Sequence, residues 1–340
     1  MRSLRHRSGA FDAKLRTLSA LVAGALTLLV GGARADGAAR PIQESTFERT
    51  VELPGDADLD VTTSSGSITV TPGPDGRARV SGRVRPAGGW RLVSPAEAVA
   101  RVAKQPPVEL QGRTLRVGYL DDDLQRQVTI DLVIELPAGA SIRSRTGSGS
   151  QHIGDFAGAV VASTGSGEIA VGRLSGSLRV STGSGNIVVD GAAGDFQAST
   201  GSGEIRAASL GGRASARSGS GNISLGLTGA GAVEASTGSG DITVRHAQGA
   251  VLVDTGSGDI VADGTPGADW RITAASGDVT LRISEVAFAV DARTSSGSLT
   301  TTHPVTVSGS VGRHTLKGSV RGGGPLIQVR TASGDIHVGQ

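Results

Sequence analysis

Cysteine is absent from the 340-residue chain, methionine occurs once, and aromatic side chains make up only 2% of it. Without cysteine, the chain can form no disulfide scaffold, thiolate zinc site, iron–sulfur cluster or thiol nucleophile. Scarce aromatics disfavour domains that stack nucleic-acid bases or sugars on aromatic rings. Beyond residue 30 no apolar run approaches the length of about 20 residues that a membrane-spanning helix needs.

Outside the N-terminus the chain also has no excess of basic residues. Lys and Arg total 33 against 31 Asp and Glu, but residues 1–35 hold six of the basic residues and only one acidic residue. The remaining chain is mildly acidic and carries no Lys/Arg-rich stripe that could follow a phosphate backbone. The composition therefore excludes a nucleic-acid partner.

The N-terminus has the order of a secretory signal peptide. A basic segment ends at Arg16, an apolar run of 13 residues covers 18–30, and the small-residue triplet Ala33-Arg34-Ala35 follows. We predict a signal peptide over residues 1–35 with cleavage after Ala35. An uncleaved anchor is the alternative, but the run is short for a span. The predicted location is exported: periplasmic, cell-surface or secreted, with no transmembrane span after signal removal.

Glycine is abundant, with 53 residues, and it marks a repeat. Most successive Ser-Gly pairs are 18 residues apart, which is typical of a solenoid. The pairs begin at Ser148, Ser166, Ser184, Ser202, Ser220, Ser239, Ser257, Ser276 and Ser296, with a last copy at Ser333.

Each 18-residue repeat divides into two halves of nine. From Gly158 to Gly221 a glycine recurs every nine residues, and apolar residues follow in alternation, as at Ile169 and Val171. Such alternation predicts a strand with one buried face. A three-sided coil of hexapeptides would need an apolar residue where Ser175 stands. We therefore predict an all-β fold, a parallel β-solenoid whose flattened coils contribute one strand to each of two facing sheets. The strand–crossover–strand rule favours a right-handed coil.

The flanking regions are predicted to cap this rod. Residues 36–145 form an N-terminal β region with one capping helix at about 95–104, and residues 146–340 form the solenoid repeats. Ser94, Pro95 and Glu97 are typical of a helix start, and Pro106-Pro107 of its end. A helix at this point would cover the open sheet edge of a solenoid end.

The phrase Thr-Gly-Ser-Gly followed by Asp, Glu or Asn and then Ile, as in 182–187 and 255–260, resembles the bacterial putative-adhesin family of exported β-strand-repeat proteins of unknown function. The resemblance covers roughly residues 41–340 as one putative-adhesin-like domain. It implies the repeat fold. It implies no catalytic residue, cofactor or substrate, because the family has no agreed activity.

The residue after the repeat glycine forms an acidic corner. Its members are Glu168, Asn186, Glu204, Asn222, Asp241, Asp259 and Asp278. Stacking brings Asp241, Asp259 and Asp278 together as weak candidates for a cation site or for contact with a basic partner. The alternative is that they form turns and protect a sheet edge. We predict no metal site and no cofactor, because a calcium-binding nonapeptide needs Asp in every nine, and the alternate nines carry Ser177, Asp195, Arg213, Ala232 and Ala250.

A row of hydroxyl residues precedes each Gly-Ser pair. It could form an exposed array for ice or carbohydrate, or turn hydroxyls that bond their own backbone. We favour the second interpretation. The row comprises Thr164, Thr182, Thr200, Ser218, Thr237 and Thr255.

Catalytic signals are weak. Asp241 and Asp259 could approach the spacing of a glycosidase carboxylate pair, but the central repeats carry no interrupting loop. The histidines at 152, 246, 303, 314 and 337 are interpreted as scattered surface residues. We therefore predict an exported, non-enzymatic β-solenoid that binds an envelope, glycan or protein partner or has a structural role. A polysaccharide-acting β-helix enzyme and a calcium-stabilised repeat module remain alternatives. Self-association, end to end or side by side, is left open.

Overall fold

The computed structural model describes residues 44–54, 57–88, 94–307 and 312–340. The predicted signal peptide and its cleavage at Ala35 lie outside the described residues, as does Trp90. No helix within the described ranges is both long enough and apolar enough to cross a membrane.

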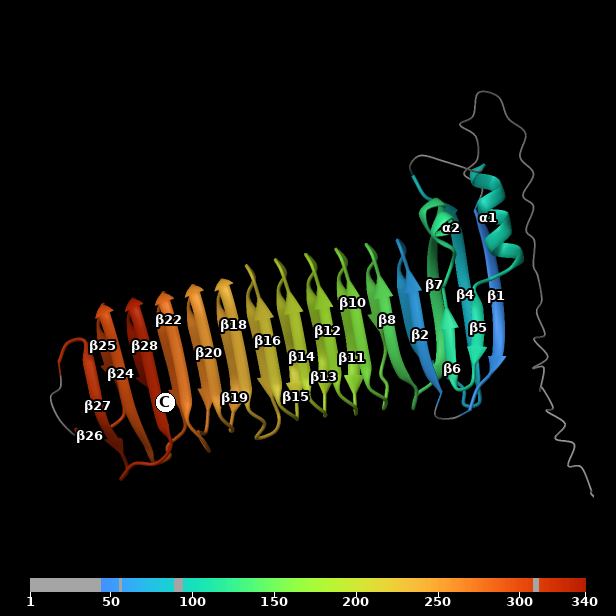
Figure 1. The fold of residues 1–340 in the computed structure, drawn as a ribbon. Coiled ribbons are helices and arrows are strands. Elements are labelled where there is room, and N and C mark those ends of the chain that lie inside the picture. The colour runs from blue at the N-terminus through green and yellow to red at the C-terminus, as the bar shows by residue number, and fades with distance from the viewer. Residues whose placement is uncertain (1–43, 55–56, 89–93, 308–311) are drawn as a thin grey trace, which may run out of the picture.

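The described strands form two long sheets that face each other along a rod (Figure 1). Sheet A has 14 strands in the order β1 (Ser45–Glu52), β4 (Arg77–Pro86), β7 (Val128–Pro137), β3 (Ile68–Gly73), β9 (Gln151–Ile153), β11 (Ile169–Leu174), β13 (Ile187–Ala192), β15 (Ile205–Leu210), β17 (Ile223–Leu227), β19 (Ile242–Ala247), β21 (Ile260–Gly264), β23 (Val279–Ile283), β29 (Ile336–Gly339) and β25 (Leu299–Thr301).

Sheet B has 15 strands among the described residues. Their order is β26 (Val305–Val307), β27 (Thr315–Val320), β24 (Phe288–Ser296), β28 (Leu326–Ser333), β22 (Trp270–Ser276), β20 (Val251–Ser257), β18 (Val233–Ser239), β16 (Ala214–Ser218), β14 (Phe196–Thr200), β12 (Leu178–Thr182), β10 (Val160–Thr164), β8 (Ser141–Thr146), β2 (Asp58–Thr63), β6 (Thr114–Val117) and β5 (Val108–Gln111).

One strand of sheet B and the next strand of sheet A make each coil, as predicted from the two nines. In β12 the side chains of Leu178, Val180 and Thr182 are buried, while Arg179 is exposed on the outer face. The parallel register pairs each residue with its counterpart 18 positions on, so Ile187 lies beside Ile205. The core is therefore a thin layer of stacked aliphatic rows, which confirms the parallel β-solenoid; its handedness stays a prediction.

The repeat glycines are required for two different reasons. A Cβ on Gly185 would lie 1.8 Å from the carbonyl oxygen of Gly167 in the preceding coil, so only glycine allows the turns to stack. Gly258 meets the same crowding and also has φ of +140°, a conformation that L side chains rarely adopt. Positive φ therefore occurs at the repeat glycines from Gly240 onward and at Gly66, whereas close approach alone explains the glycines of the coils between them.

The N-terminal end is a coil with a cap added outside it. Strands β2 and β3 stack directly on β8 and β9, so the solenoid runs without a break through the predicted boundary at residue 145, which stays a prediction as a domain division. Helix α1 (Pro95–Lys104) is confirmed: the Glu97 main-chain N–H donates to Ser94 Oγ at 3.2 Å. Its buried face contacts β1 and β4. A second short helix, α2 (Asp122–Gln127), was not predicted.

The C-terminal end does not follow chain order. Strand β28 lies between β22 and β24, and β29 lies between β23 and β25. The coil of β24 and β25 therefore lies outside the coil of β28 and β29, although it comes earlier in the sequence. The antiparallel strands β26 and β27 connect these two coils along the chain. The regular Ser-Gly spacing does not predict this exchange, because every copy of the repeat fits any layer equally well.

Candidate functional site

The acidic corner is a hydrogen-bond ladder between coils. The main-chain N–H of Asp259 donates to Asp241 Oδ1 at 2.9 Å, and that of Asp278 donates to Asp259 Oδ1 at 2.8 Å. The ladder continues from Asp278 to Asp335 in the coil of β28 and β29, which we call the inserted coil, and from Asp335 to Ser298, which precedes β25. The structure thus brings the three candidate aspartates into one exposed row and assigns one oxygen of each to the backbone of the next coil.

Side-chain length decides which corner residues join this ladder. Asn186 Oδ1 accepts the Glu204 N–H at 3.0 Å, and Asn222 Oδ1 accepts the Asp241 N–H at 2.8 Å. Glu204 instead forms an ion pair with Arg206, two residues further along the chain. The shorter Asp and Asn side chains therefore have a structural role at this corner. Among the described residues, no three His, Asp or Glu side chains cluster as metal ligands would; binding of a cation by the row stays untested.

The hydroxyl row is buried at the ends of the sheet B strands. Thr182 is only 6% exposed, and its Oγ1 donates to the Gly167 carbonyl of the preceding coil at 3.0 Å. The same oxygen accepts the Gly185 N–H of its own turn at 3.1 Å. The predicted hydrogen bond from each hydroxyl to its own turn is therefore observed at Thr182, and this residue also joins neighbouring coils, which was not predicted. An exposed array for ice or carbohydrate is wrong for these residues.

One histidine, His303, differs from the scattered surface residues that we expected, whereas His246 is exposed as predicted. His303 is 5% exposed, packs edge-on against Phe288 with ring centroids 5.3 Å apart, and places Nε2 3.0 Å from the Gly339 carbonyl oxygen. His246 does meet a carboxylate, with Nδ1 3.6 Å from Asp263 Oδ1, and has φ of 59°. His303 is a core residue of the C-terminal end, and His246 lies at a bulge between β19 and β21.

The outer face of sheet B carries a feature that the sequence analysis missed, which we call the arginine trough. It is an open hollow of 720 Å³ across strands β8 to β18. The register places Arg143, Val161 and Arg179 side by side on three successive strands. Its outward-facing lining residues are Arg143, Val161, Ser177, Arg179, Asp195, Gln197, Arg213, Ser215, Arg217 and Glu234.

Arginine side chains in the trough differ in their partners. Glu234 forms ion pairs with both Arg217 and Arg213. Arg143 and Arg179 have no hydrogen-bond or ion-pair partner among the described residues. The hollow therefore holds two exposed arginines without an ion-pair partner, two strand spacings or about 10 Å apart, and Arg143 lies at its β8 edge with Asp60 as the neighbouring residue on β2.

A polar cluster closes the N-terminal end of the trough. Arg145 Nη2 lies 3.0 Å from Asp60 Oδ1 and 3.0 Å from the Tyr119 hydroxyl oxygen, which itself donates to Asp60 at 2.8 Å. Burial alone would lower the pKa of Arg145, but the charge of Asp60 and these hydrogen bonds raise it. The Arg116 guanidinium stacks 3.9 Å from the centroid of the Tyr119 ring. Asp60 and Glu234 thus bound the basic stretch at its two ends.

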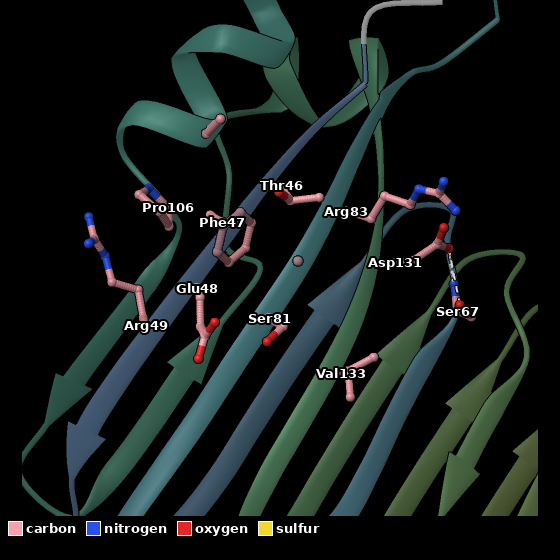
Figure 2. A pocket seen from close by; sticks show the side chains of 12 residues that line it. Thr46, Phe47, Glu48, Arg49, Ser67, Ser81, Arg83, Pro106, Asp131 and Val133 are labelled. Atoms are coloured by element: carbon pink, nitrogen blue, oxygen red, sulfur yellow. Dashed lines mark hydrogen bonds between the residues drawn. The ribbon is translucent and has the colours of Figure 1, made fainter. Parts of the chain in front are cut away.

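A second hollow, of 390 Å³, lies at the capped N-terminal end (Figure 2). Phe47 fills the space beside Gly82, where a Cβ would come within 2.2 Å of the ring. Asp131 accepts hydrogen bonds from the N–H and hydroxyl of Ser67 at 2.9 and 3.1 Å. Asp131, Glu48 and Arg83 each form an ion pair, and Arg49 is the one charged lining residue without a partner among the described residues, so this hollow offers less unpaired charge than the arginine trough.

Sequence alone held a partial signal for the trough. Arg143, Arg179 and Arg217 stand at outward positions of alternate repeats, but the net acidic balance of residues 36–340 hides them. Only the stacking of coils turns residues 18 or 36 apart into neighbours on one face.

Several solved structures are similar to this chain. A putative cell adhesion protein from Clostridium sporogenes is 9% identical, with 88% of this chain and 100% of that chain covered and a TM-score of 0.23. A putative adhesin from Parabacteroides distasonis is 10% identical, with 86% and 97% covered and a TM-score of 0.34. A putative lipid binding protein from the same species is 12% identical, with 86% and 96% covered and a TM-score of 0.30.

These likenesses carry no argument about function at such identities and TM-scores. No curated protein matches the chain. A family model does match residues 131–339, more than half of the chain, and its range takes in β7 to β29. The resemblance drawn from the repeat phrase is confirmed, and the chain belongs to the Toastrack DUF4097 family.

Proposed function

We propose that this protein is an exported, non-enzymatic β-solenoid that binds a partner along its length, as an adhesin-like or structural component of the cell envelope. The observation that carries the proposal is the use of the repeated polar side chains. The buried hydroxyl row and the Asp and Asn ladder both hold coil to coil. These side chains therefore do not occupy the outer faces of the two sheets, which are long, regular surfaces. The arginine trough lies on the outer face of sheet B.

The repeat offers little for catalysis. Asp241 and Asp259 could form a glycosidase pair only with both carboxylates free for acid and base or nucleophile roles. Here Asp241 Oδ1 and Asp259 Oδ1 each accept a main-chain N–H from the next coil. A carboxylate that must accept this hydrogen bond to support a turn is poorly suited to gain a proton in each catalytic cycle.

The test is a combined binding and turnover screen. The protein is incubated with acidic and neutral glycans and with envelope extract, and both retention and the appearance of new sugar chain ends are measured. We expect retention of at least one envelope component without cleavage. Turnover that is abolished by Asp259→Asn would contradict the proposal and favour the polysaccharide-acting enzyme. Retention of nothing from any fraction would contradict the binding role itself.

A further inference from the structure

We propose that the arginine trough binds a linear polysaccharide that carries anionic groups, laid along the rod axis. This inference rests on the proposed function and deepens it by naming the ligand class and the site. Arg143 and Arg179 are the two side chains that recognise the anionic groups, because both are exposed and neither has a partner among the described residues. Guanidinium groups pair with carboxylate, sulfate or phosphate through two parallel N–H donors.

The shape of the trough suits an extended polymer. It crosses six adjacent strands of sheet B, from β8 to β18, or about 24 Å at the usual spacing between strands. Val161 is the only residue that separates Arg143 from Arg179 in the register. Beyond Arg179 the same row continues through Gln197 and Ser215 to Glu234, whose carboxylate pairs with Arg217.

A row of hydroxyl groups runs alongside the trough. Ser163, Ser181 and Ser199 are directly paired on β10, β12 and β14, two residues further along each strand than the row of Arg179. Their hydroxyls have no partner among the described residues. The serine row thus offers evenly spaced donors and acceptors, one per strand, to the hydroxyl groups of successive sugars. Arg145 and Arg217 end this row on either side.

Other anionic partners fit less well. A single-stranded nucleic acid would need aromatic rings on which its bases could stack, and no aromatic side chain lines the outer floor between Arg143 and Arg217 except the buried Phe196. A lipid surface would need a projecting apolar or basic face, whereas the charges here lie in a hollow. The carboxylates of Asp195 and Glu234 also border the trough, so its positive charge without an ion-pair partner is confined to Arg143 and Arg179.

The experiment measures affinity for polygalacturonate and for its fully methyl-esterified form, which has the same backbone without charge. The test variant is Arg143→Gln with Arg179→Gln. The matched control is Arg245→Gln with Arg282→Gln, because these two exposed arginines lie two strands apart on the outer face of sheet A. We expect the charged polymer to bind the native protein, about a tenfold loss in the test variant, and no loss in the control.

Each other outcome overturns the inference or reassigns the ligand. Equal binding of the charged and esterified polymers, or equal loss in the two double variants, would overturn it while leaving a binding function in place. A sulfated dextran and a glycerol-phosphate polymer distinguish the source of the anionic group. Tighter binding of a thymidine oligonucleotide or of phosphatidylglycerol vesicles, lost in the test variant, would overturn the polysaccharide. Circular dichroism of both double variants shows whether the fold is kept.

Discussion

At the scale of single residues, adjacent positions where a corner meets a strand have opposite environments. Ile205 is fully buried between Ile187 and Ile223 in the stacked aliphatic row of sheet A. Glu204 precedes it at the corner, partly exposed, and its carboxylate pairs with the exposed Arg206. Because an exposed ion pair contributes little stability, the inside–outside pattern predicts very different costs for changes at these two neighbours.

Ile205→Asp is predicted to lower the free energy of unfolding by several kcal/mol, because it buries an unpaired carboxylate and removes a large apolar side chain. Glu204→Ala is the control, with an expected change within about 0.5 kcal/mol. Urea denaturation followed by circular dichroism measures both. Equal damage from the two changes would mean that Glu204 has a role other than the exposed corner residue described here.

At the scale of the element, the hydroxyl row makes each turn depend on the previous coil. Thr182→Val is predicted to destabilise the protein by about 1–3 kcal/mol, because it leaves the Gly167 carbonyl and the Gly185 N–H without their buried partner. Ser184→Ala, two residues on and exposed, should leave stability unchanged. Thermal melting of the two variants checks the contrast. A valine tolerated as well as the alanine would show that neighbouring turns hold their geometry without the hydroxyl.

The Asp ladder predicts a pH dependence at the inserted coil. Hydrogen bonds from Ser298 lower the pKa of Asp335 below its usual value. The bond from the main-chain N–H contributes more than the bond from the side chain. A lowered folded-state pKa stabilises the protein above the unfolded pKa of about 3.9, and this stabilisation is lost as the pH falls through the lowered value. Asp335→Asn keeps an oxygen acceptor but cannot titrate.

The variant Asp335→Asn should therefore match the native protein at pH 7 and lose less stability below pH of about 4. Urea midpoints measured from pH 7 to pH 3 test this, with Glu204→Gln as the control because its side chain accepts no such N–H. If the curves of Asp335→Asn and the native protein run in parallel, the hydrogen bond does not contribute as proposed.

Prediction from the sequence succeeded where the signal is local or repeated, and it failed for features that depend on how the coils stack. The nine-residue alternation predicts the strands of the central coils, and Ser94 with Pro95 predicts α1, because these signals are local. Helix α2 begins with an N-cap aspartate and two acidic residues, but it has only six residues and Asp121 makes no side-chain capping bond, so its signal in the sequence is weak. The arginine trough could not be derived from any one segment, since Arg143 and Arg179 become neighbours only through register.

At the scale of the whole molecule, stability is distributed along the rod. Each coil contacts the coils on either side, so a solenoid can lose one end while the other stays folded. The inserted coil is the exception in chain order. Strands β28 and β29 lie between β22–β23 and β24–β25 in the sheets, although β24 and β25 come before them in the sequence. The position of residues 288–301 therefore depends on β28 and β29, which are the last two strands in the sequence.

Truncation after Gly324 tests this dependence. Removal of β28 and β29 leaves β24 without its parallel neighbour and β25 without its partner. Strands β8 to β21 keep both of their neighbours, and β22 and β23 each lose one. We expect fast hydrogen exchange and proteolysis over residues 285–324, with slow exchange retained in the central coils. Ile336→Asp is the milder variant, since Ile336 is fully buried between Val279 and Leu299. It should loosen the same segment, whereas Gln328→Ala on the outer face should not. Protection of residues 288–301 in the truncated chain would mean that β24 can pair directly with β22 and that the last coil is dispensable.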